Sequence, residues 1–192
     1  MNWLENLLII AGVSLDIFAG MECQGALVAK VNKKHLMMIC AVITAWQLAA
    51  LYVGNAFAHL LYVDQLAKDE RFIGTVLAVV IFFSLGIRLI AKAIKNERIN
   101  EHRVENPGFK RFFRLAAVTS FYTLLIGIAF GFLETNLPLV LIMAVCVTVT
   151  VVILGTYTGY HFGFEHKTKA YVIGAALLWI AGFDVLFRYV VK

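Results

Sequence analysis

Six long apolar stretches limit the fold of this chain more than any other feature of its sequence. Each runs for about 20 residues or more, which is enough for a helix to cross the roughly 30 Å hydrocarbon core of a bilayer. The stretches are Leu4–Ala29, Leu36–Tyr62, Phe72–Ala93, Phe113–Leu133, Leu137–Phe162 and Tyr171–Val191. Hydrophobic residues make up 61% of the chain and charged residues 15%, whereas a soluble domain is about half apolar and a quarter charged. The sequence therefore predicts an all-α integral membrane protein, with six transmembrane helices in a single domain over residues 1–192.

Several other classes of protein are disfavoured. The first stretch lacks a basic leading region and carries Glu5, so we expect a retained helix and not a secretory signal peptide. Cys23, Cys40 and Cys146 lie within apolar stretches without CxxC spacing, which argues against a disulfide scaffold or a zinc knuckle. The sequence has no HExxH motif, glycine-rich phosphate loop or ATP-binding element. It therefore predicts neither an enzyme nor a primary pump, and no cofactor.

Basic residues are concentrated in and beside the connections that follow the first, third and fifth stretches. They are Lys30, Lys33, Lys34, Lys92, Lys95, Arg98, Arg103, Lys110, Arg111, Arg114, Lys167 and Lys169. The other side carries only Lys68, Arg71, Arg188 and Lys192. By the positive-inside rule, the three basic connections lie in the cytoplasm and both termini lie outside. The net charge of +5 thus indicates orientation in the cytoplasmic membrane, with the lipid bilayer as partner and no nucleic acid.

The two halves of the chain resemble each other. Val13-Ser14-Leu15-Asp16 aligns with Thr119-Ser120-Phe121-Tyr122, and Ile73-Gly74 aligns with Ile173-Gly174. Because each copy has an odd number of helices, the second copy enters the membrane in the opposite direction. The alternative is chance similarity between apolar segments.

This alignment predicts two inverted three-helix repeats. The first covers about residues 4–95 and the second about 112–192, with a polar cytoplasmic linker over about 96–111. Inverted repeats of this kind place their substrate site near the bilayer midplane, at the interface between the copies.

The carboxylate of Asp16 lies near the middle of the first apolar stretch. A charge at the bilayer centre costs about 2.5–3.5 kcal/mol on insertion scales, so it needs a compensating partner. Gly12, Gly20 and Cys23 share its helix face, and glycines there let another helix approach and weaken the helix locally. The pattern favours Asp16 as a cation ligand or proton carrier. The alternative is a structural acid hydrogen-bonded to Ser or Thr hydroxyls.

Neutral oxygen donors are available elsewhere in the apolar stretches. Ser14 and its repeat partner Ser120 are candidates, although a membrane-helix serine usually bonds its own backbone carbonyl. Gln47 can offer its amide oxygen to a cation or can tie two helices together. Both interpretations of Gln47 stay open.

A second candidate cluster is Met21-Glu22-Cys23, whose thioether, carboxylate and thiol suit a soft or borderline divalent ion. Contiguous residues point around a helix in different directions, so they share one ion only if the helix unwinds. Glu22 as an interface residue is the alternative. Near the end of the last stretch, Asp184 and Arg188 are spaced to form an i,i+4 ion pair. The residues expected to anchor helices at the membrane interface are Trp3, Tyr62 and Tyr189.

Two short motifs resemble those of a known family. Ser14-Leu15-Asp16-Ile17-Phe18-Ala19 resembles the S-x-D-x-F-A signature of the bacterial manganese efflux pumps, which belong to the lysine-exporter superfamily of six-helix membrane proteins. Leu85-Gly86-Ile87-Arg88 resembles the family's LGxR run. The resemblance covers nearly the whole chain and implies export. Two acids that it implies are absent, because their positions hold Tyr122 and Gln47. Glu22, Cys23 or a deprotonated Tyr122 would have to supply the missing negative charge.

The sequence thus favours a secondary transporter that exports a small divalent cation, with Mn²⁺ as the first choice. Asp16 is the expected central residue of a midplane site. The expected neutral donors are Ser14, Gln47, Ser120 and Tyr122. Two alternatives stay open: an exporter of an amino acid or other small organic solute, and a degenerate copy that serves as a membrane scaffold. A homo-oligomer is also left open.

Overall fold

A computed structural model describes residues 3–27, 33–61, 69–95 and 109–189. Its helices are α1 (Trp3–Leu27), α2 (Lys33–Leu61), α3 (Asp69–Lys95), α4 (Phe109–Phe132), α5 (Leu137–Phe162) and α6 (Lys167–Tyr189). The described residues form no strands, and all six helices are long and apolar enough to cross a membrane. The predicted fold class is therefore confirmed. Tyr62 and the predicted linker up to residue 108 lie outside the described residues, as does the side chain of Tyr189.

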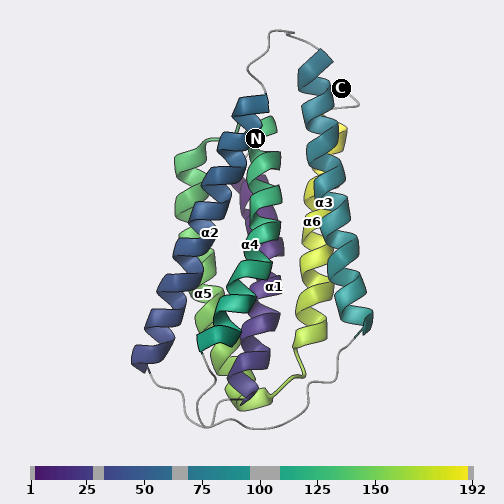
Figure 1. The fold of residues 1–192 in the computed structure, drawn as a ribbon. Helices are drawn as coiled ribbons and strands as arrows, with labels where there is room; N and C mark the ends of the chain where they lie inside the picture. The colour runs from purple at the N-terminus through teal and green to yellow at the C-terminus, as the bar shows by residue number, and fades with distance from the viewer. Residues whose placement is uncertain (1–2, 28–32, 62–68, 96–108, 190–192) are drawn as a thin grey trace.

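The helices run alternately up and down in one bundle (Figure 1). Helix α1 is central and packs against α5, α6 and α4, while α2 packs against α4 and α5, and α3 against α6 and α4. The first and last described helical ends lie together at one end of the bundle. The opposite end carries the described basic residues Lys33, Lys34, Lys92, Lys95, Lys167 and Lys169. That this basic end faces the cytoplasm stays a prediction.

Burial follows the position of each helix in the bundle. Helix α1 is apolar around most of its circumference and holds Ile9, Ile17 and Met21 fully buried, as expected for a central helix. Large apolar side chains such as Met37 and Leu60 on α2 are exposed on the outside. An apolar outer surface of this extent is typical of helices whose solvent is lipid.

Glycines allow two pairs of helices to approach closely. A Cβ atom at Gly155 or Gly159 of α5 would collide with the backbone of α1, and one at Gly54 of α2 or Gly127 of α4 would collide with the backbone of the facing helix. Small residues four apart are typical of tight membrane helix contacts. In the predicted repeat, α1 matches α4 and α2 matches α5. The contact between α1 and α5 therefore corresponds to the contact between α4 and α2. The inverted repeat itself stays a prediction.

Candidate functional site

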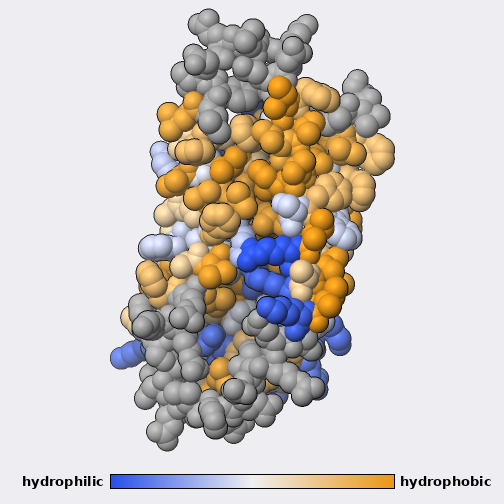
Figure 2. All heavy atoms as spheres, turned by 45° about the vertical axis from the view of Figure 1, so that its right-hand side comes forward, coloured by the Kyte–Doolittle hydropathy of each residue, from blue (hydrophilic) through white to orange (hydrophobic). Residues whose placement is uncertain are grey.

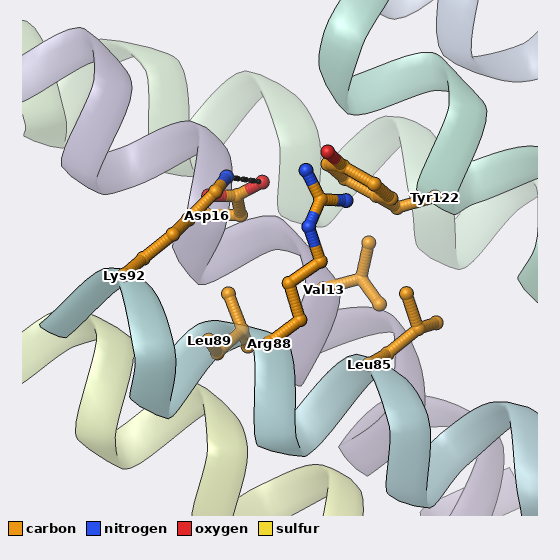
Figure 3. Close-up of a pocket in the computed structure, with 7 residues that line it drawn as sticks. All are labelled: Val13, Asp16, Leu85, Arg88, Leu89, Lys92 and Tyr122. Atoms are coloured by element: carbon orange, nitrogen blue, oxygen red, sulfur yellow. Dashed lines mark hydrogen bonds and ion pairs between the residues drawn. The ribbon is translucent and has the colours of Figure 1, made fainter. Parts of the chain in front are cut away.

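The Asp16 carboxylate is buried in the middle of α1 and forms an ion pair with Lys92 of α3. The Lys92 ammonium donates to both carboxylate oxygens, with Nζ–Oδ1 and Nζ–Oδ2 distances of 2.6 and 2.8 Å (Figure 3). The Asp16 side chain is 4% exposed, whereas that of Lys92 is 29% exposed. The positive partner that a carboxylate at this depth requires is thus a residue of the chain itself.

A second cation lies one helical turn before Lys92. The Arg88 guanidinium packs over the ring of Tyr122 on α4, 3.6 Å from the ring centroid (Figure 3). The Lys92 ammonium is 5.2 Å from the same centroid and 5.7 Å from that of Tyr171 on α6. Contacts between cations and aromatic faces at these distances are stabilising, and more so when the groups are shielded from water. Helices α1, α3, α4 and α6 therefore meet around a small set of charged and aromatic groups.

A small cavity lies between these groups. It is lined by Val13, Asp16, Leu85, Arg88, Leu89, Lys92 and Tyr122 (Figure 3). Its volume is about 10 Å³, which is close to the minimum that holds one water molecule. A hydrated metal ion does not fit there while Lys92 occupies its present position. A cation can reach the Asp16 carboxylate from this side only if the Lys92 ammonium moves.

A larger polar groove adjoins the cavity and shares Arg88 and Lys92 with it. The groove has a volume of about 400 Å³, and its remaining lining residues are Ala91, Lys95, Lys167 and Tyr171. Figure 2 shows hydrophilic residues gathered in the lower half of a face that is otherwise largely apolar. The groove gives the part-exposed Lys92 side chain a polar region into which it can swing.

Gln47 lies away from this cavity and ties three helices together. Its Nε2 group donates to the Thr123 hydroxyl on α4 at 3.2 Å, and its Oε1 atom accepts from the Thr148 hydroxyl on α5 at 2.6 Å. All three side chains are buried. In this state the Gln47 amide acts as a link between α2, α4 and α5, one of the two roles that the sequence left open.

The two serines differ from Tyr122 in their placement. The Ser120 hydroxyl donates to the Ala116 carbonyl at 2.6 Å, the backbone bond that is common for serine in a membrane helix. Ser14 is buried on α1 but does not line the cavity around Asp16. Among the predicted neutral donors, the structure therefore brings only Tyr122 into the same cavity as Asp16.

Glu22 and Cys23 lie further along α1 and line neither the cavity nor the groove. The Glu22 side chain is fully buried, and its Oε1 atom accepts from the backbone N–H of His166 at 2.8 Å. This bond joins α1 to the start of α6. Over the described residues, no group of three or more His, Cys, Asp or Glu side chains converges in a way that could hold a metal ion. The structure thus shows Glu22 as a link between helices.

A third set of charges lies near the opposite end of the bundle. The Arg188 guanidinium is 2.8 Å from a carboxylate oxygen of the buried Glu5 and 3.7 Å from one of Asp184. The predicted pair between Asp184 and Arg188 is confirmed, and Glu5 is an additional partner.

Lys92 and Arg88 line the cavity beside Asp16, and the sequence reasoning did not place them in the candidate site. Lys92 was counted only toward membrane orientation, and Arg88 entered only as part of the LGxR run. Their i,i+4 spacing could have indicated a shared face of α3, since both lie inside an apolar stretch where cations need partners.

Six helices that are long and apolar enough to span a membrane, two of them joined by a buried ion pair, define a multi-pass membrane protein. The chain belongs to the family described as "Putative manganese efflux pump", whose profile matches residues 30–186.

Curated relatives match nearly the full length of the chain. Proteins named "Putative manganese efflux pump MntP" are 26% identical over 189 residues in Campylobacter jejuni and 25% identical over 193 residues in Acetivibrio thermocellus. The matches cover 98% of this chain in both cases, and 98% and 92% of the two relatives. No solved structure matches the chain.

Proposed function

We propose that this protein is a secondary transporter that exports a small divalent cation, with Mn²⁺ as the first choice, across the cytoplasmic membrane. Membership of the family and the names of the relatives support the cargo and the direction. The observation that carries the proposal is the buried Asp16 carboxylate, whose counter-ion is a flexible and partly exposed lysine. Carboxylate oxygens suit Mn²⁺ as ligands, and Asp16 is the acid that lies in the cavity.

The location of the site supports a place at the interface of the two predicted repeats. Asp16 and Tyr122 occupy matching positions in the predicted alignment, and they line the same cavity. Gln47 and Ser120 are hydrogen-bonded elsewhere in this state. They would have to exchange partners before they could act as ligands.

Lys92 has a defined role in this mechanism. Its ammonium holds the place of the substrate cation, so that the Asp16 carboxylate is neutralised when no ion is bound. An arriving cation displaces the ammonium toward the groove, and release of the cation restores the ion pair. A carboxylate in an apolar bundle therefore has a positive partner in both states, which avoids the cost of a bare charge at this depth.

Manganese tolerance in cells tests the proposal. A bacterial strain without its own manganese exporter should grow at higher Mn²⁺ when it produces the wild-type protein, and Asp16→Asn should remove this protection. Asp184→Asn is the matched control, because it neutralises an acid that is 45% exposed and lies outside the cavity. Membrane levels of each variant are measured by immunoblot. Equal protection by wild type and Asp16→Asn at equal levels contradicts the assigned role of Asp16.

One observation favours a second candidate cargo. The cavity holds both a carboxylate, Asp16, and a guanidinium, Arg88, and these groups are complementary to the ammonium and carboxylate of an amino acid. Binding to the purified protein separates the two candidates. Metal binding lost in Asp16→Asn supports cation export, whereas amino-acid binding lost in Arg88→Gln supports the organic cargo. No flux of either class in vesicles supports a non-transporting scaffold.

A further inference from the structure

The groove between α3 and α6 is strongly basic. Of its lining residues, Arg88, Lys92 and Lys95 come from α3 and Lys167 comes from α6, and none is acidic. Lys92 is paired with the single charge of Asp16. Arg88 adds a further positive charge beside this pair, and its guanidinium lies over the neutral ring of Tyr122. Such a concentration of positive charge attracts anions.

The depth of this charge in the bundle points to a membrane anion. Arg88 lies seven residues before the end of α3 at Lys95, or about 10 Å along the helix axis. Around it, α3 exposes large apolar residues, including Ile87 and Ile94, which are 61% and 79% exposed. Hydrophilic residues therefore interrupt an otherwise apolar face before the basic end of the bundle is reached (Figure 2). Cationic side chains at this depth are costly unless they meet an anion or reach the headgroup region.

The groove and its surroundings together match the two parts of a phospholipid. The Arg88 guanidinium offers the planar set of donors that suits a phosphate, and the lysines add point charges around it. The exposed isoleucines of α3 offer an apolar surface for acyl chains. Basic pockets between transmembrane helices near the cytoplasmic side are a recognised form of anionic lipid site. A free phosphate would contact the same cations but would not contact the exposed isoleucines of α3.

We propose that this groove binds the phosphate of an acidic phospholipid from the leaflet at the basic end of the bundle. The binding has a consequence that rests on the proposed function. A bound phosphate lowers the positive potential beside Asp16, which would otherwise repel a divalent cation that approaches through the groove. Acidic lipid is therefore expected to assist transport as well as to occupy the groove.

Lipid retention by the purified full-length protein tests this site without any metal. Native mass spectrometry in a neutral detergent compares added phosphatidylglycerol with phosphatidylcholine, and inorganic phosphate serves as competitor. The wild-type protein is expected to prefer phosphatidylglycerol. Arg88→Gln should weaken its binding about tenfold or more, because a charge-assisted contact is lost, and Arg88→Lys should weaken it less.

Lys169→Gln is the matched control, because Lys169 is exposed on the same helix as Lys167 but does not line the groove. It should bind phosphatidylglycerol as the wild type does. Equal binding by Arg88→Gln and wild type overturns the site, as does an equal loss in Lys169→Gln. Displacement of the lipid by inorganic phosphate at equal concentration overturns the lipid as occupant. Because no metal is present, none of these results depends on the transport proposal.

Discussion

Removal of Lys92 from the Asp16–Lys92 pair should destabilise the protein much more than removal of Asp16. The Asp16 side chain is 4% exposed, so Lys92→Gln leaves a buried carboxylate without its cation. Breaking a buried pair in this way costs about 3–5 kcal/mol, and we expect the lower end because Arg88 lines the same cavity.

The reverse change should be much milder. In Asp16→Asn the remaining charge belongs to Lys92, whose side chain is 29% exposed and borders the polar groove. The ammonium can turn toward water, so the cost should be about 1 kcal/mol, as for a partly exposed pair. The double variant Asp16→Asn with Lys92→Gln leaves no charge behind. It should therefore be more stable than Lys92→Gln alone.

Unfolding of the three variants in one detergent measures these differences as a double-mutant cycle. We expect the wild type to be the most stable and Lys92→Gln the least stable. Asp16→Asn and the double variant should both lie between them. A Lys92→Gln protein that is as stable as Asp16→Asn would refute the reasoning. It would show that the carboxylate is solvated or paired in another way.

Three further substitutions test other contacts by thermal unfolding. Gly159→Ala should lower the free energy of unfolding by about 1–3 kcal/mol, because the added Cβ collides with α1. Gly182→Ala should change it little, because the nearest atom to the added Cβ is 3.4 Å away. Equal effects of the two substitutions would contradict the packing argument. Gln47→Leu should cost about 1 kcal/mol, since it removes two interhelical hydrogen bonds, and an unchanged melting temperature would show that they contribute nothing. Arg188→Gln should lower the free energy of unfolding by about 1–3 kcal/mol, because the Glu5 side chain, which is 5% exposed, loses its cation. A loss below about 0.5 kcal/mol would mean that the other contacts of Glu5 are enough to stabilise its carboxylate.

The helices could be predicted from the sequence because hydrocarbon imposes a simple requirement on length and composition. The predicted stretch Leu137–Phe162 matches α5 residue for residue, and the first stretch, Leu4–Ala29, differs from α1 by only a few residues. Charged residues at helix ends account for most of the remaining differences. Helices α3 and α6 extend over Lys95 and Lys167, beyond the apolar stretches themselves.

The site could be predicted only in part. Asp16 stood out because a charge within an apolar stretch is costly, and its burial is confirmed. Its partner could not be inferred in the same way. Lys92 lies close to the end of α3, where a lysine ordinarily reaches the headgroup region, and the offset of α3 against α1 that brings it to Asp16 depends on packing.

Hydrogen-bond partners were equally difficult to infer from the chain. Gln47 and Thr148 are 101 residues apart in sequence, and nothing in their local context pairs them. The bond from the His166 backbone to Glu22 likewise depends on how α6 begins beside α1. Such pairings are set by the register of neighbouring helices, which apolar patterns specify only loosely.

Manganese flux in vesicles that contain only the purified protein tests the central claim most directly. Vesicles with wild-type protein should move Mn²⁺ down an imposed gradient, and vesicles with the same amount of folded Asp16→Asn protein should move it no faster than empty ones. Equal Mn²⁺ flux through both proteins would contradict the account, because it would mean that the ion crosses the bundle without binding the Asp16 carboxylate.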